Sequence, residues 1–344
     1  MASALPENQA RFTLGELARA TGGTLSDPRS AAREVVGVST DSRATLEGKL
    51  FVALKGERFD GHAYARAAAE AGATALLVES DVGALSVPTL RVASTLAALG
   101  AVAALHRGKF AGHVVGVAGS AGKTTTRSAV GAVLELLAPG RVHQTTGNLN
   151  NLIGVPLVLL GLKPEHRFAV VELGTNAPGE VSALTAMARP DAGVLTLIGL
   201  EHTEGLGDLD GIEREEGEIW SGLTAEGLAI ANADDARVQR TLQTMNHTRS
   251  LSYGYAADAK KVDYCFVTVC FQIHPHRLYR LHGISFRDAY PASCHLRFLD
   301  HFRQKYSGFL YGAFHPHRAW FCHQPFAVIR QAGLDDWLLS QILF

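Results

Sequence analysis

The segment best suited to chemistry is a glycine-rich turn between an apolar run and a Lys-Thr pair. It reads Gly119-Ser-Ala-Gly-Lys-Thr-Thr125 and follows the run Val114–Ala118. Backbone N–H groups of such a turn, with the positive end of the following helix, stabilise phosphate oxygens. Lys123 can reach the β- and γ-phosphates, and the Thr124 hydroxyl can bind Mg²⁺. We therefore expect a nucleoside triphosphate to be bound by Gly119, Ser120, Ala121, Gly122, Lys123, Thr124 and Thr125.

Three polar residues follow apolar runs that read as strands. Glu172 closes the run from Phe168, His202 comes shortly after Leu195, and Asn232 follows Leu228–Ala231. Ligands of open α/β sheets lie beyond the carboxyl ends of the strands, and a carboxylate there suits Mg²⁺. The alternatives are a hydrogen-bonded structural histidine at 202 and, at 232, a plain turn, because Asn-Ala-Asp-Asp is a good turn sequence.

A further carboxylate is predicted on a buried helix face. In a helix over 212–223, Glu216 falls inside the apolar stripe of Ile212, Ile219, Trp220 and Leu223, whereas Glu218 points away and Glu213 and Glu215 flank it. A buried carboxylate is costly unless it is paired or bound to a metal. Glu216 is therefore a candidate metal ligand, and the alternative is an edge carboxylate that reaches solvent.

The elements that position these residues predict an α/β fold. Short strands over 35–38, 50–54 and 75–78, with a helix over 63–71, indicate a small N-terminal α/β domain. From residue 113, strands and helices alternate as in a doubly wound parallel sheet. Strands are expected over 114–118, 168–173, 193–198 and 228–231, and helices over 124–137, 180–188 and 212–223.

Composition excludes several classes of protein. Basic and acidic residues number 32 and 33, and 47% of residues are hydrophobic, so the chain is globular and offers no basic surface field for nucleic acid or anionic lipid. No apolar run approaches the ~20 residues of a membrane span. The first twenty residues lack an apolar signal region, and we expect a cytoplasmic protein.

The composition changes abruptly near Tyr255. Residues 1–255 contain 18 Glu and no Cys, whereas residues 256–344 contain no Glu and all four Cys. We expect domains over 1–107 and 108–255, followed by an atypical tail over 256–344. A frame change in the coding DNA would explain this tail. The alternatives are a divergent domain or, because the tail is rich in His and Cys, a zinc site whose ligand spacings match no known framework.

The motifs together resemble the Mur ligases, over about residues 11–255. Besides the phosphate loop, the resemblance lies in Thr40-Asp-Ser-Arg43, the segment 50–62, the segment Thr146–Pro156 and Glu172-Leu-Gly-Thr-Asn176. The last two are most similar to those of the members that add D-alanyl-D-alanine to UDP-N-acetylmuramoyl-tripeptide.

The resemblance implies a substrate domain, a P-loop ATPase domain and a third domain for the incoming amine. ATP would phosphorylate the tripeptide carboxylate, and D-alanyl-D-alanine would attack the acyl phosphate. It implies a monomer with two Mg²⁺ ions, held by Thr124, Glu172, His202 and Glu216, and places Asn232 near the adenine. It also implies that the peptide substrate is bound by Asp41, Ser42, Arg43, Lys55, Asn148 and Asn151.

The sequence departs from the family in two places. Where members usually carry a carbamylated lysine, this chain has Glu216, a carboxylate on a shorter stem. After about residue 255 the family's later motifs are not recognisable. Two further readings therefore stay open: another Mur-type ligase, adding diaminopimelate or lysine or acting like folylpolyglutamate synthase, and a nucleotide-binding remnant without turnover.

Overall fold

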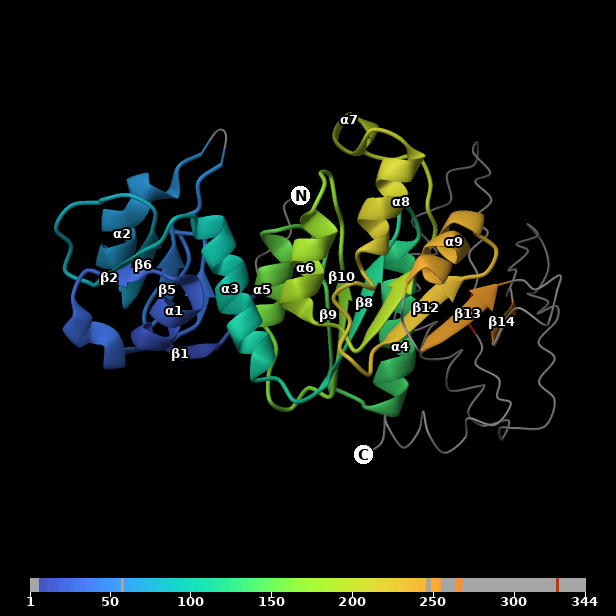
Figure 1. Cartoon of the computed structure of the whole chain (residues 1–344). Helices are drawn as coiled ribbons and strands as arrows, with labels where there is room; N and C mark the ends of the chain where they lie inside the picture. The colour runs from blue at the N-terminus through green and yellow to red at the C-terminus, as the bar shows by residue number, and fades with distance from the viewer. Residues whose placement is uncertain (1–5, 57–58, 246–248, 255–263, 268–325, 328–344) are drawn as a thin grey trace, which may run out of the picture.

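The computed structural model describes residues 6–56, 59–245, 249–254, 264–267 and 326–327. The predicted α/β class is confirmed, with two sheets that are mainly parallel. Figure 1 shows the smaller sheet at one end of the described part and the larger sheet beyond it, with α3 between them. Apart from two short strands, the predicted tail over 256–344 lies outside the described residues. The hypotheses of a zinc site and of a frame change concern this tail and are therefore not tested by the structure.

The N-terminal part contains a five-stranded sheet of order β2-β7-β6-β5-β4 and a separate β1–β3 pair. Strands β4 to β7 run parallel, and β2 pairs antiparallel with β7. Its elements are β1 (Arg11–Thr13), α1 (Leu14–Thr21), β2 (Thr24–Leu25), η1 (Pro28–Ala32), β3 (Glu34–Val36), β4 (Val38–Ser39), β5 (Leu50–Val52), η2 (Gly61–Tyr64), α2 (Ala65–Glu70), β6 (Ala75–Val78), β7 (Thr89–Arg91) and α3 (Thr95–Gly108).

The larger sheet has the order β15-β14-β13-β12-β11-β8-β10-β9 and is parallel except for the β14–β15 pair. Its elements are β8 (His113–Ala118), α4 (Lys123–Leu137), β9 (Val142–Gln144), α5 (Gly154–Leu160), β10 (Phe168–Glu172), α6 (Glu180–Ala188), β11 (Ala192–Leu195), α7 (Thr203–Leu206), α8 (Leu209–Gly217), β12 (Leu228–Asn232), α9 (Ala236–Thr244), β13 (Ser250–Gly254), β14 (Tyr264–Val267) and β15 (Phe326–Ala327).

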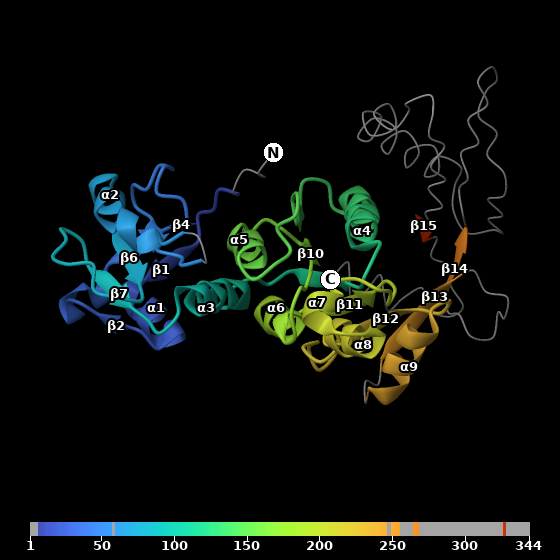
Figure 2. The same cartoon turned by 90° about the horizontal axis from the view of Figure 1, so that it is seen from above.

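This sheet is covered on both faces. Figure 2 shows α4 and α5 on one side of the strands and α6, α8 and α9 on the other. Strand β8 lies between β10 and β11, so the chain leaves it in one direction toward β10 and β9 and later in the other direction toward β11 and β12. The carboxyl end of β8 is therefore a topological switch point, where open α/β sheets bind ligands.

The predicted elements agree with the structure except at some boundaries and at the strand expected over 35–38, which is divided at Gly37 into β3 of one sheet and β4 of another. The helix expected over 212–223 is α8, which begins earlier, at Leu209, where the Asp208 side chain accepts the N–H of Gly211, and ends at Gly217. Turns continue to residue 222, and the apolar stripe survives this change because Ile212, Ile219 and Trp220 are all fully buried. The helix expected over 63–71 is divided into η2 and α2.

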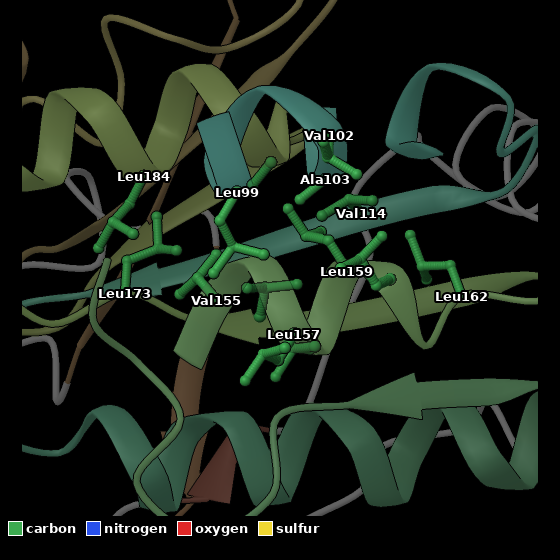
Figure 3. Packing of buried hydrophobic residues seen from close by; sticks show 14 of the residues in the cluster. Leu99, Val102, Ala103, Val114, Val155, Leu157, Leu159, Leu162, Leu173 and Leu184 are labelled. Atoms are coloured by element: carbon green, nitrogen blue, oxygen red, sulfur yellow. The ribbon is translucent and has the colours of Figure 1, made fainter. Parts of the chain in front are cut away.

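Helix α3 connects the two sheets. Figure 3 shows Leu99, Val102 and Ala103 of α3 in one core with Val155 of α5 and Leu184 of α6. At the C-terminal end of α3, the buried Arg107 donates to the carbonyl groups of Ala188 and Arg189 at 2.8 and 2.9 Å, and it lies 3.3 Å from Asp191.

None of the helices in the described part combines the length and the apolar character that a membrane crossing requires.

Two stacked histidines, His143 in β9 and His166 in the loop before β10, give the fold a dependence on pH. His143 stacks on His166 with ring centroids 5.1 Å apart, and its Nε2 bonds to the Val158 carbonyl at 2.7 Å. Burial lowers the pKa of His143 to about 4. The neutral ring is therefore favoured in the folded state, whereas the unfolded chain takes up this proton near pH 6.5.

We predict that the folded state loses stability as pH falls from about 6.5 to about 4, by roughly 1–3 kcal/mol from His143. His143→Gln should flatten this loss, because its amide can still donate to Val158 but takes up no proton. The measurement is the thermal unfolding midpoint followed by circular dichroism across this pH range. His113→Gln, at an exposed position of β8, is the matched control, and an unchanged slope in His143→Gln would contradict the assignment.

Candidate active site

The glycine-rich turn has a backbone that only glycine adopts without strain. Gly119 and Gly122 have φ values of 121° and 84°. A Cβ atom at Gly119 would lie 2.2 Å from the Thr196 hydroxyl oxygen, far inside contact distance. The turn leads directly into α4, whose first backbone N–H groups have no partner within the helix. Those groups and the helix dipole together make an anion site.

The turn is fastened to the segment that follows β11. Ser120 donates its backbone N–H to the Leu197 carbonyl at 2.8 Å, and its hydroxyl accepts the N–H of Gly199 at 2.9 Å. The Thr196 hydroxyl donates to the Ala121 carbonyl at 2.7 Å. The shape of the turn is thus preorganised, so little ordering is needed when a phosphate binds.

Lys123 lies folded over the turn. Its ammonium group donates to the Gly119 carbonyl at 2.5 Å and is 3.6 Å from the Glu201 carboxylate. It is also 3.9 Å from Glu216. The side chain is only 14% exposed, so its charge acts in a partly desolvated setting where electrostatic attraction to phosphate is strengthened.

Glu172 and Thr124 are brought together at the carboxyl end of β10. The Thr124 hydroxyl lies 3.0 and 3.1 Å from the two carboxylate oxygens. Glu172 also accepts from the side-chain amide of Asn150 at 3.0 Å, and Arg127 lies 3.4 Å away. This is a polar cluster beside the phosphate loop that supplies hydroxyl and carboxylate oxygens, the ligands that Mg²⁺ prefers.

The burial predicted for Glu216 is confirmed, since its side chain has no exposed surface. One carboxylate oxygen accepts the N–H of Gly119 at 2.6 Å, which joins α8 to the turn. Burial raises the pKa of Glu216, and the neighbouring Glu201 carboxyl raises it further against the opposing effect of Lys123. The flanking Glu213 and Glu215 are also buried, each bound by its own partners: Arg237 and Arg240 hold Glu213, and the N–H groups at the start of α6 hold Glu215.

His202 and Asn232 lie in different settings. The His202 side chain is 44% exposed, 3.9 Å from Glu201, and its backbone adopts a left-handed conformation with φ of 46°. Asn232 donates its side-chain amide to the Thr196 carbonyl at 2.8 Å and accepts the N–H of Asp234 at 2.9 Å. The bond with Asp234 is typical of a turn, which is the alternative interpretation of Asn232. The bond with Thr196 connects Asn232 to the segment that holds the phosphate loop.

The candidate substrate residues of the N-terminal part follow two adjacent strands. Asp41, Ser42 and Arg43 come after β4 and Lys55 comes after β5, and these strands pair in parallel, so their carboxyl ends share one edge of the sheet. Asp41 and Arg43 form a bidentate ion pair with two 2.9 Å contacts, and the hydrogen bond from Arg43 lowers the pKa of Asp41 to about 2.

The two candidate asparagines lie before α5. Asn151 accepts the N–H groups of Ile153 and Gly154 at 3.2 and 2.8 Å and so fixes the start of that helix. Asn148 is exposed. The neighbouring Asn150, which the sequence reasoning left out, is the asparagine that contacts Glu172.

The sequence reasoning also missed Arg127 and Glu201. Arg127 lies one turn of helix beyond Lys123, so α4 periodicity could have placed it on the same face. Glu201 lies next to His202, and its position after a strand end gave the same signal that singled out the histidine.

The oxygen and N–H groups around the phosphate loop suit Mg²⁺ and a nucleotide, although the protein groups alone do not form a complete set of metal ligands. Within the described ranges, no three His, Cys, Asp or Glu side chains gather closely enough to hold a metal ion. The buried Oε1 atoms of Glu201 and Glu216 lack hydrogen-bond partners there, and each lies within 4 Å of the Lys123 ammonium group. Mg²⁺ commonly takes one or two carboxylates and completes its shell with water and phosphate, and this arrangement can support phosphoryl transfer.

Comparison with known proteins agrees with this geometry. Residues 34–107 match the model described as "Mur ligase family, catalytic domain", and residues 117–279 match that of the Mur ligase middle domain. The second range runs past Tyr255, where the composition changes.

Individual relatives carry related names. The chain is 44% identical over 198 residues to the UDP-N-acetylmuramoyl-tripeptide--D-alanyl-D-alanine ligase of Escherichia coli, which covers 58% of this chain and 43% of that protein. It superposes on the crystal structure of MurF from Acinetobacter baumannii with a TM-score of 0.69 at 33% identity, over 77% of this chain and 57% of that one. The structure of MurF from Thermotoga maritima in complex with ADP gives a TM-score of 0.61 at 29% identity, over 69% of this chain and 53% of that one.

The chain therefore spans about half the length of the curated relatives that it matches. Both family models describe Mur ligases, and they match the part with the five-stranded sheet and the part with the phosphate loop in the order in which the structure contains them. The chain belongs to the Mur ligase family.

Proposed function

We propose that the chain carries the substrate-binding and ATP-binding parts of a ligase that adds D-alanyl-D-alanine to UDP-N-acetylmuramoyl-tripeptide in the cytoplasm. The observation that carries the proposal is the phosphate loop, with Lys123 above it and the contact between Thr124 and Glu172 beside it. The identity of 38–44% to three ligases of that name supports the choice of substrate. The protein would act as a monomer.

The residues divide the chemistry between them. Lys123 and the N-terminal amides of α4 bind the phosphates, which neutralises charge on the phosphoryl group as it passes to the tripeptide carboxylate. Thr124 and Glu172 would hold one Mg²⁺ ion and His202 and Glu216 a second, and these ions would stabilise the same charge. Asn232 would lie close to the adenine.

The substrate would bind along the five-stranded N-terminal sheet. Asp41, Ser42, Arg43 and Lys55 lie at one sheet edge and offer donors for a sugar nucleotide. Asn148 and Asn151 precede α5, next to the Glu172 cluster, where the peptide end of the substrate would arrive. We propose domain limits of 1–107 and 108–255 for these two functions.

Whether the protein catalyses the complete ligase reaction depends on residues 256–344. In the family pattern the amine and some nucleotide contacts come from later segments, and an acyl phosphate that lacks its nucleophile and its shield from water is unproductive. From the loss of Glu and the gain of Cys after residue 255 we infer that a frame change replaced those segments. The alternative hypotheses, a ligase for diaminopimelate or lysine or a folylpolyglutamate synthase-like enzyme, can be separated from this one by the amine that promotes release of ADP.

We predict that Lys123→Ala weakens ATP binding by roughly tenfold or more, because the phosphates lose their nearest cation. Isothermal titration of the full chain with ATP and Mg²⁺ measures this. Lys163→Ala is the matched control, since Lys163 is 58% exposed and lies 4.0 Å from Glu165 on the surface. Equal affinities in the two variants would remove the phosphate-loop assignment.

We further predict that the 344-residue chain binds UDP-N-acetylmuramoyl-tripeptide but forms no pentapeptide with ATP, Mg²⁺ and D-alanyl-D-alanine. Chromatography of the UDP-linked product, together with ADP release, tests this. Restoring the other reading frame after codon 255 should produce turnover that depends on D-alanyl-D-alanine and not on diaminopimelate or lysine.

Two results would count against this proposal. Pentapeptide formation by the 344-residue chain at roughly 1 s⁻¹ or faster would show that its tail is a working domain. Absence of any binding of the UDP-linked tripeptide would contradict the substrate itself.

A further inference from the structure

Glu201 and Glu216 converge on the ammonium group of Lys123 from two different elements. Glu201 follows β11 and Glu216 belongs to α8. Their Oε1 atoms lie 3.6 and 3.9 Å from Lys123 Nζ, and the side chains are 19% and 0% exposed. Neither Oε1 atom has a hydrogen-bond partner in the described part of the chain. The fully buried Glu216 therefore aims an unpartnered oxygen at the same point as Glu201.

Two carboxylates face one ammonium group, and that ammonium donates its hydrogen bonds to the carbonyl groups of Gly119 and Ser120. Each carboxylate thus has a nearby positive charge but no donor on its inner oxygen. A buried carboxylate is stabilised by pairing or by binding a metal, and the two Oε1 atoms could therefore bind a stronger cation than the ammonium group.

Binding of a nucleotide would separate Lys123 from the two carboxyl groups. A phosphate-loop lysine reaches toward the phosphates, and Lys123 would then leave the two carboxylates. A divalent ion in the vacated position would contact both carboxylates and a phosphate oxygen, which is the ligand set that Mg²⁺ favours.

We propose that Glu201 and Glu216 form a divalent-cation site, and that the Lys123 ammonium occupies its position until phosphate draws the lysine away. Glu201 thereby joins the active site as a metal ligand from the segment between β11 and α7, and it supplies the second carboxylate that the shorter Glu216 cannot provide alone. The identity of this ion as a cofactor of phosphoryl transfer rests on the proposed function.

The proposal makes lysine and metal competitors in the nucleotide-free protein. Removing the ammonium should therefore strengthen metal binding. If Glu201 and Glu216 served only to hold the loop through Lys123, removal of the lysine would create no metal site.

Electron paramagnetic resonance of free Mn²⁺, with the full chain and without nucleotide, tests the competition. We expect Lys123→Met to bind one Mn²⁺ at least about fivefold more tightly than the unaltered chain, and the addition of Glu201→Gln or Glu216→Gln to weaken that binding roughly tenfold. Glu218→Gln in the same background is the matched control, because Glu218 lies two residues further along and accepts from Ser221 at the surface. It should leave Mn²⁺ binding unchanged.

A second readout separates loss of the site from loss of the fold. Mn²⁺ should raise the thermal midpoint of Lys123→Met above its value in EDTA, and this rise should vanish in the double variants while their midpoints in EDTA stay close to that of the parent. Unaltered Mn²⁺ affinity in Lys123→Met, or in the variant that adds Glu201→Gln, would overturn the proposal. Neither measurement uses a ligase substrate, so failure of the proposed enzymatic function leaves this test intact.

Discussion

The hydrogen bond between the backbone N–H of Gly119 and Glu216 ties the phosphate loop to the helix across the sheet. The turn must be glycine at this point because Thr196 fills the space where a side chain would begin. The same contact fixes α8, so Glu216 cannot move without shifting the turn. The loop, the end of β11 and α8 thus behave as one unit, and the positions of Lys123 and Glu201 follow from it.

The second cluster, around Glu172, depends on that unit through α4. Lys123 and Thr124 are consecutive residues of one helix, so the orientation that sends the lysine over the turn also sends the threonine hydroxyl toward β10. Arg127, one turn further along, lies beside the same carboxylate and contacts the carbonyl of Thr145. Lys123 and Thr124, in the first turn of a single helix, therefore face both of the carboxylate clusters that we propose as cation sites, and this arrangement suits a reaction in which charge moves along a phosphoryl group.

Sequence reasoning predicted the fold class and the larger elements because strand and helix periods are local properties. It found Glu216 in a buried stripe for the same reason, since Ile212, Ile219 and Trp220 lie on the face that a helical wheel predicts. The contacts that decide the role of Glu216 are with Gly119, 97 residues away, and no local period reports them. Asn150 was likewise indistinguishable from Asn148 and Asn151 until the fold brought it to Glu172. The roles of the candidate site residues stay predictions.

The junction at Arg107 has a consequence for synthesis on the ribosome. Its partners Ala188, Arg189 and Asp191 lie 81 to 84 residues further along the chain. The ribosome adds roughly 5–20 residues per second. The apolar face of α3 therefore stays exposed for several seconds after its synthesis, until the segments that cover it have been made. The N-terminal sheet can fold earlier, but the contacts that join the two sheets at Arg107 form only after α6 is made. All of these segments precede residue 255, so the nascent chain can form the contacts between the two sheets before the ribosome reaches the point where the composition changes.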